Sequence, residues 1–273
     1  MIRRRSLLAL AAATAVAGCS RSGARPASGG SRKRGIGTWY FEGVDRALAE
    51  ADVSWYYTWS PAPGQVAAPA RAEFVPMIWG PDDLGRAGAT AGDTLLGFNE
   101  PDVTEQANLS ADQALDLWPQ LTATGRRLGS PAVSAGAATP GGWLDRFLAG
   151  AAGRGLRVDF VAVHWYGTNP ATAVDDLGGY LRAVYDRYRR PIWLTEFALA
   201  DFTRGVSSAW YAPRSDQAAF ATAATALLDA LPYVERYAWF ALSDRGSDFR
   251  TGLYDEHGQL TSVGEAYRTA EPG

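Results

Sequence analysis

The chain carries two short apolar runs that each contain a glutamate near the end: LLGFNEP at residues 95–101 and IWLTEF at residues 192–197. Both runs have the length and composition of buried strands. Removing a carboxylate from water at the end of such a run is costly, so two cases beside aromatic residues require a chemical reason. Cleavage of a glycosidic bond is one reaction that needs two carboxyl groups facing each other.

Six further apolar runs alternate with helical stretches around these two. In chain order the eight runs are Gly35–Phe41, Val53–Ser60, Glu73–Trp79, Thr94–Glu100, Ser130–Ala135, Val158–Trp165, Ile192–Phe197 and Val234–Ala241. Runs that are buried on both faces and alternate with helices about eight times predict a closed parallel (β/α)8 barrel. We expect this barrel to form a single domain over residues 35–270. A doubly wound open sheet is the alternative, but no glycine-rich fingerprint follows the first run.

Local signals refine the helical stretches. Ser110 and Ser215 stand where helix N-caps are expected, each with an acid just behind it. Pro119 lies inside the stretch that follows Ser110, so we expect a kink or a break there. The segments 61–71 and 81–92 have the composition of loops, which leaves the second and third repeats short of helix.

The N-terminus has the features of an export signal. Three arginines precede an apolar stretch, and residues 1–18 end just before Cys19 in the manner of a bacterial lipobox. We therefore expect residues 1–18 to be removed, Cys19 to be lipidated and residues 19–34 to form a flexible tether. The protein would then be an exported lipoprotein, anchored to the outer face of the cell membrane or released outside the cell. An ordinary secretory signal with a chance cysteine is the alternative.

Composition excludes several classes of function. The chain has 273 residues, 12% of them aromatic, and a formal net charge of −3 without a basic stripe, which argues against a nucleic-acid partner. The two histidines are far apart in the sequence and no HExxH pattern occurs, so no metal site is expected. A GxSxG elbow is also absent from the sequence. We expect a monomer that works without a cofactor.

Counting the runs places the two glutamates on the predicted barrel. Glu100 closes the fourth run and Glu196 closes the seventh. The carboxyl ends of barrel strands form the rim where barrel enzymes place their catalytic residues. A separation of about 5 to 5.5 Å between the carboxyl groups implies a retaining reaction, and about 6.5 to 9.5 Å implies inversion. A pair of structural acids held by arginines is the alternative interpretation.

Three motifs in order now resemble a known family. GFNEPD at residues 97–102, HWYG at residues 164–167 and WLTEF at residues 193–197 are similar to glycoside hydrolase family 128, a family of retaining (β/α)8 barrels that act on β-1,3-glucans. The resemblance implies that Glu100 is the general acid/base and Glu196 the nucleophile. Many related barrels place an arginine on the second strand to support the nucleophile, but residues 53–60 contain none.

Other residues near the motifs are candidates for the substrate site. Asn99 is expected to hydrogen-bond the sugar 2-OH, and His164 or Tyr166 to donate to Glu196. Trp239 is the candidate floor of the site. The aromatic residues expected to line further sugar subsites are Trp39, Tyr57, Trp59, Trp79 and Trp165. For each of them, simple packing in the barrel core is the competing interpretation.

These observations predict a β-1,3-glucan hydrolase whose partner is a β-glucan oligo- or polysaccharide. Two other hypotheses stay open at this point. One is a β-glucan-binding lipoprotein of the cell surface with little turnover, which the tether and the many aromatic residues suggest. The other is a retaining hydrolase of a different β-linked glycan, such as a β-1,4-linked one.

Overall fold

A computed structural model describes residues 31–271, so the predicted signal peptide, Cys19 and most of the tether lie outside the described residues. Eight parallel strands occur in the order of the predicted runs. They are β1 (Arg34–Gly37), β2 (Trp55–Tyr57), β3 (Glu73–Phe74), β4 (Thr94–Leu95), β5 (Arg127–Leu128), β6 (Val161–Tyr166), β7 (Ile192–Ala198) and β10 (Val234–Trp239). Within the described part, no helix is long and apolar enough to cross a membrane.

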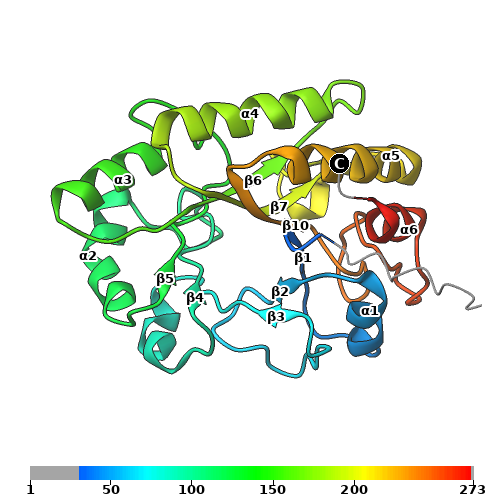
Figure 1. Ribbon diagram of the computed structural model, residues 1–273, viewed down its shortest axis with the longest axis horizontal. Helices are drawn as coiled ribbons and strands as arrows, with labels where there is room; N and C mark the ends of the chain where they lie inside the picture. The colour runs from blue at the N-terminus through cyan, green and yellow to red at the C-terminus, as the bar shows by residue number, and fades with distance from the viewer. Residues whose placement is uncertain (1–30, 272–273) are drawn as a thin grey trace, which may run out of the picture.

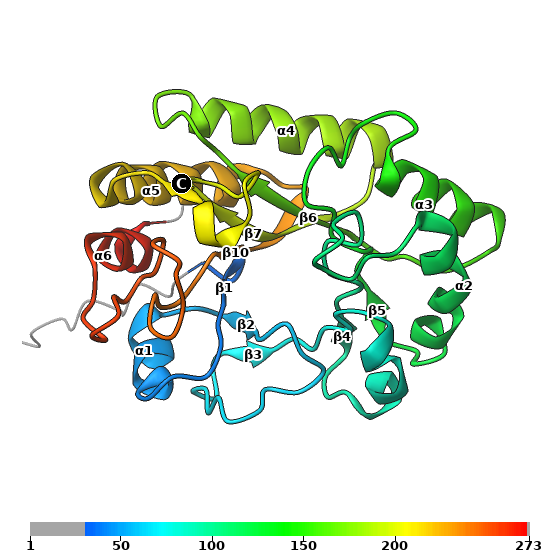
Figure 2. The same ribbon diagram turned by 180° about the vertical axis from the view of Figure 1, so that it is seen from behind.

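The strands form a closed ring. Six of them make one parallel sheet in the order β3-β2-β1-β10-β7-β6, and β4 and β5 pair with each other. Isolated parallel bridges join the two parts: Met77 to Leu96 on one side, and Gly129 to Phe160 and Val133 to Val163 on the other. The helices lie outside this ring, as Figures 1 and 2 show. The predicted (β/α)8 barrel is therefore confirmed.

The helices and a small hairpin complete the fold. The helices are α1 (Val44–Ala51), the 3-10 helix η1 (Pro81–Ala89), α2 (Ala111–Thr122), α3 (Trp143–Gly153), α4 (Ala173–Tyr188), the short 3-10 helix η2 (Val206–Ser208), α5 (Arg214–Ala230) and α6 (Ser262–Thr269). The hairpin consists of β8 (Ala200–Asp201) and β9 (Trp210–Tyr211), which pair antiparallel just after β7. No helix or strand covers residues 61–71, as expected.

Some local predictions hold and others are wrong. Ser110 caps α2 in a capping box with Gln113. Pro119 does not break this helix, because the neighbouring Trp118 and Leu121 are fully buried and hold its last turn against the barrel, while the kink expected there as the other outcome stays a prediction. Ser215 is not an N-cap: α5 begins one residue earlier, behind Pro213, whose fixed φ suits the start of a helix.

Two segments differ in structure from the predicted runs and loops. Residues 81–89 were expected to be a loop but form η1, which starts at a proline and carries two acids in its first turn, both favourable at a helix start. The fifth strand is β5 rather than Ser130–Ala135, which makes only isolated bridges beyond it. Apolar patterning missed β5 because it begins with Arg127, whose charge is paired with Glu235 at 2.6 Å.

Large side chains fill the interior of the barrel and close its lower end. The inner cluster contains Trp55, Tyr57, Val75, Met77, Leu96, Ala132, Phe160, Ala162, Trp193 and Ala238. Below it, the guanidinium of Arg236 lies over the ring of Trp193 and pairs with Glu73 at 2.5 Å. The barrel is therefore a packed core, and its accessible end is the one where the strands finish.

This packing predicts a strong effect at one glycine. A Cβ on Gly129 would lie 2.5 Å from the ring of Phe160, which itself stacks on Trp193 at 4.3 Å. Gly129→Ala should therefore lower the free energy of unfolding by about 1–3 kcal/mol, measured by denaturant titration. The control is Gly179→Ala in the exposed part of α4, where a Cβ meets nothing within 4 Å. There we expect a gain of about 0.5–1 kcal/mol, and equal losses in both variants would contradict this account.

Candidate active site

Glu100 and Glu196 meet at the open end of the barrel. Glu100 follows β4 and its amide bonds to the carbonyl of Ala132, while Glu196 lies near the end of β7. One oxygen of each carboxylate and one ring nitrogen of His164 all lie within 4.8 Å of one another. This spacing is shorter than the about 6.5 Å or more that an inverting enzyme needs to place a water between its carboxyl groups. The geometry fits the retaining arrangement.

A β-bulge turns Glu196 into the site. Val163 of β6 pairs with Leu194 of β7, but the next residue, His164, pairs with Glu196, so Thr195 is an extra residue. Trp193 points into the barrel, and strict alternation would then direct Glu196 outward. The bulge reverses the alternation, because Glu196 faces His164 inside and the next residue, Phe197, packs in the outer core.

His164 lies between the two carboxylates. Its side chain is fully buried, with Nδ1 2.9 Å from Oε1 of Glu100 and Nε2 3.5 Å from Oε1 of Glu196. Burial lowers the pKa of His164, but the charge of Glu196 and the hydrogen bond with Glu100 outweigh it and raise the pKa above its usual value. The imidazole therefore holds its second proton more strongly than an ordinary histidine does, and it lies between the two acids.

The carboxylate of Glu196 accepts hydrogen bonds on both oxygens. Tyr166 donates from its hydroxyl to Oε2 at 2.5 Å, and Trp59 donates from its indole to Oε1 at 2.7 Å. Burial has the largest effect on the pKa of Glu196 and raises it, and the nearby charge of Glu100 raises it further. The charge of His164 and the hydrogen bonds from Tyr166 and Trp59 lower this pKa, but the net change is an increase. The hydrogen bonds thus oppose the cost of burying the ionised form.

Several predicted substrate residues do lie at this site. Tyr166 contacts Glu196 as expected, and Asn99 is buried beside Glu100, with its Nδ2 donating to Gln106 at 3.2 Å. The Oδ1 of Asn99 has no hydrogen-bond partner, which leaves an acceptor in the site. Gln106 was missed, because nothing in its sequence surroundings distinguishes it from an ordinary loop glutamine.

Trp39, Trp59 and Trp79 are half-buried at the rim. The rings of Trp39 and Trp59 lie 6.2 Å apart, and the indole of Trp39 donates to the carbonyl of Arg245 at 2.8 Å. Trp59 and Trp79 both pack on the upper side of the interior cluster. Their uncovered ring surfaces are suited to stacking on sugars, and their role as sugar subsites stays a prediction.

Two of the predicted sugar contacts, those of Trp239 and Tyr57, are wrong because both side chains are fully buried, and a third residue, Trp165, packs away from the carboxylates. Trp239 is fully buried in the outer core, where its ring packs against Phe197 and its indole donates to the carbonyl of Thr251 at 2.7 Å. Trp165 also faces outward, because it alternates with the inward residues of β6, and it packs on Phe220 of α5.

Tyr57 faces inward but is fully buried, so it contacts the protein and not a sugar. Its hydroxyl donates to the carbonyl of Thr195 at 2.8 Å and lies 3.4 Å from Oε1 of Glu196. Phe240, the neighbour of Trp239, lies beside the site, with its ring 5.7 Å from that of Trp59 and 5.8 Å from that of Tyr166.

The three central groups are also close enough to bind a metal ion. Their existing contacts argue against that use. Tyr166 and Trp59 already donate to both oxygens of Glu196, and the raised pKa of His164 means that a metal ion would compete with a more strongly held proton. The expectation of a metal-free site stays a prediction.

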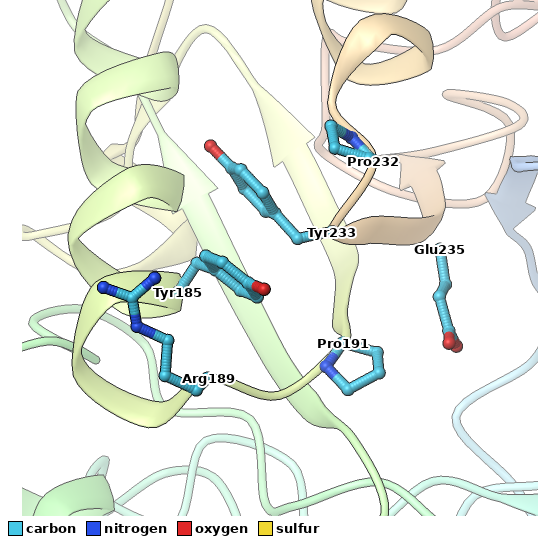
Figure 3. Close-up of a pocket in the computed structure, with 6 residues that line it drawn as sticks. All are labelled: Tyr185, Arg189, Pro191, Pro232, Tyr233 and Glu235. Atoms are coloured by element: carbon cyan, nitrogen blue, oxygen red, sulfur yellow. The ribbon is translucent and has the colours of Figure 1, made fainter.

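A separate pocket lies at the opposite end of the barrel. Figure 3 shows its lining residues, Tyr185, Arg189, Pro191, Pro232, Tyr233 and Glu235. They come from the end of α4 and the starts of β7 and β10, whereas Glu196 lies near the end of β7. The rings of Tyr185 and Tyr233 stack on each other at 4.4 Å, so each covers one face of the other. This pocket is therefore distinct from the carboxylate site.

A (β/α)8 barrel with two close carboxyl groups at its open rim defines a glycoside hydrolase. The comparisons agree with this class. A family model described as a glycosyl hydrolase catalytic core matches residues 40–267. The chain belongs to glycoside hydrolase family 128, since it is 53% identical to a subgroup I endo-β-1,3-glucanase of that family from Amycolatopsis mediterranei, solved with laminaritriose. That match covers 88% of this chain and 100% of the other, with a TM-score of 0.82.

Two further matches are more distant. A subgroup II endo-β-1,3-glucanase from Sorangium cellulosum is 31% identical over 88% of this chain and 99% of its own, with a TM-score of 0.72. The Alkali-sensitive linkage protein 1 of Schizosaccharomyces pombe is 30% identical over 254 residues, which is 87% of this chain but only 44% of that protein. The chain therefore spans less than half of this fungal relative.

Proposed function

We propose that the protein is an endo-acting β-1,3-glucan hydrolase that retains the anomeric configuration. The observation that carries this proposal is the close approach of Glu100 and Glu196 around His164. The substrate and the internal mode of cleavage are supported by the endo-β-1,3-glucanases similar to this chain, one of which was solved with a laminarioligosaccharide.

The reaction takes place in two displacements. Glu196 attacks the anomeric carbon while Glu100 gives its proton to the leaving glycosidic oxygen, so the glycosidic bond breaks as the glycosyl–enzyme bond forms. Glu100, now ionised, then removes a proton from a water molecule, which attacks the same carbon and releases Glu196. Two inversions at one carbon give net retention. His164 contacts both carboxylates, so it keeps their relative positions fixed during the two displacements.

Retention and endo action are tested together by following the first products from a soluble laminarin. In deuterated water, NMR should show the β-anomer of the new reducing end before mutarotation produces the α-anomer. Early samples should contain a range of oligosaccharide lengths rather than one small product. First appearance of the α-anomer would contradict the retaining mechanism, and release of only one short sugar would contradict endo action.

We also propose that the enzyme is exported and held at the membrane by a lipid on Cys19. The support is the sequence alone, in which a charged segment, an apolar stretch and a lipobox-like end precede this cysteine. Such an anchor adds hydrophobic binding to a membrane, which none of the described helices is long and apolar enough to cross.

Cys19→Ser should move the protein from the membrane fraction to the soluble exported fraction. The measurement is fractionation of cells that express each form, with incorporation of labelled fatty acid as a second readout. Cys19 is the only cysteine of the chain, so any label that depends on a thiol is assigned to it. A variant that stays with the membrane would refute the lipid anchor.

A further inference from the structure

Trp59 has an unusual backbone conformation for its residue type. It lies just beyond β2 with a φ of +50°, in the left-handed region that favours glycine. An aromatic residue there costs on the order of 1–2 kcal/mol, and such strain persists only where the surroundings impose it. What the conformation provides is the direction of the indole, whose N–H donates to Oε1 of Glu196 at 2.7 Å.

The packing around Trp59 fixes its ring in this direction. A Cβ on Gly37 of β1 would lie 2.6 Å from the indole, so the glycine leaves the space that the ring occupies. Tyr57 and Phe240 hold the ring from two other sides, with centroids at 4.8 and 5.7 Å. The indole N–H therefore has little freedom to turn away from Glu196.

The groups around Glu196 show what the contact with Trp59 contributes. The titratable groups facing Glu196 are Glu100 after β4, His164 and Tyr166 on β6, and Tyr57 on β2. Among the described residues, no lysine or arginine forms an ion pair with Glu196. Its one ion-pair partner there is His164, with Nε2 3.5 Å from Oε1. Trp59 and Tyr166 add a neutral donor to each oxygen, and so they orient the carboxylate without a second opposing charge.

We propose that Trp59 is a positioning residue for the nucleophile, and that its indole N–H takes the role that an arginine on the second strand would otherwise fill. A neutral hydrogen bond suits this role because Glu196 loses its negative charge as it attacks. A permanently charged arginine, added to the contact with His164, would stabilise the charged ground state more strongly than the transition state. This inference rests on Glu196 being the nucleophile.

The test is the pH profile of kcat/KM for laminarin hydrolysis by Trp59→Phe. Glu196 must be ionised to attack, so activity falls as the pH drops through its pKa, and loss of a donor raises that pKa. We expect the acid limb to move up by about one pH unit, the size of one charge-assisted hydrogen bond. We also expect kcat at the optimum to fall about 10-fold, as expected for a misplaced reacting group.

The matched control is Trp39→Phe. It removes an indole N–H from the same aromatic group, but that N–H donates to a backbone carbonyl and not to Glu196. Its acid limb should coincide with that of the wild type, whatever its KM. Replacing Trp59 by benzothienylalanine keeps the bicyclic shape without the donor, so a folding defect of the phenylalanine variant does not block the test.

The outcomes separate this inference from the proposed function. An acid limb that stays in place in both Trp59 variants, or that moves equally in Trp39→Phe, overturns the role of Trp59. If Glu196→Ala keeps wild-type activity, the nucleophile itself is wrongly assigned and the proposed function fails first. The expected result is a shifted limb in the Trp59 variants alone, with melting temperatures that show folded protein.

Discussion

Glu196→Ala should lose nearly all hydrolysis of laminarin, roughly 10⁴- to 10⁶-fold in kcat. Without the carboxylate, no covalent intermediate forms, and the rest of the site contributes only substrate binding and the proton of Glu100. The side chain is almost buried and receives donors from Tyr166 and Trp59, so its removal leaves these two groups without their acceptor. Release of reducing sugar measures the effect.

Azide distinguishes a lost nucleophile from a damaged protein. A small anion fits the space left by the carboxylate and attacks the anomeric carbon of a substrate with a good leaving group, which yields the α-glycosyl azide after a single inversion. The control is Glu105→Ala, the same change at an exposed position nearby, which should keep wild-type activity. Activity of Glu196→Ala near that of the wild type would refute its assignment.

The barrel and its glutamate pair could be predicted because they depend on features that sequence expresses directly. Buried parallel strands appear in the sequence as runs of apolar residues, and the glutamates of residues 95–101 and 192–197 interrupt two such runs near their ends. The order of the runs was sufficient to place both at one rim. β5 was displaced in the prediction, because its first residue, Arg127, is a charged residue whose partner is remote in sequence.

The contacts that position Glu196 could not be predicted in the same way. Regular alternation from Trp193 would direct Glu196 away from the barrel interior, and only the extra residue Thr195 brings it inside. Nothing in the local composition reveals such a bulge. The interaction of Trp59 with Glu196 joins residues 137 positions apart and depends on a left-handed backbone at a tryptophan.

The error at Trp239 has a different cause. The alternation of side chains along β10 indicated that Trp239 faces outward, but the prediction gave more weight to its being a tryptophan. Ala238 faces the interior and Trp239 the outer core, so the next inward residue is Phe240. A tryptophan near a strand end is an attractive candidate for sugar stacking, yet its side of the strand decides what it touches. The same principle explains why Trp165 packs on α5 while His164 and Tyr166 reach the carboxylates.

Glu100→Ala should affect the two steps of the reaction differently. For laminarin we expect a loss of about 10²- to 10⁴-fold in kcat/KM, because the leaving sugar oxygen needs the proton. For an aryl β-laminaribioside with a dinitrophenol leaving group, which departs without protonation, the first step should stay fast. The second step should be slow, because no base activates water. The result is a burst of dinitrophenol and accumulation of the glycosyl–enzyme, both measurable by rapid mixing and mass spectrometry.

Glu100→Gln serves as the matched variant. In the wild type, Nδ1 of His164 lies 2.9 Å from the carboxylate of Glu100. An amide at this position keeps an acceptor for Nδ1, but it neither gives a proton to the sugar nor takes one from water. If the role of Glu100 is proton transfer, both variants show the burst; if it is only to hold His164, the glutamine variant recovers activity on laminarin. Azide should speed turnover of the trapped intermediate and give the β-glycosyl azide, because the attack now follows a first inversion by Glu196. Opposite azide anomers from the Glu100 and Glu196 variants would assign the two glutamates separately, and the α-anomer from Glu100→Ala would contradict that assignment.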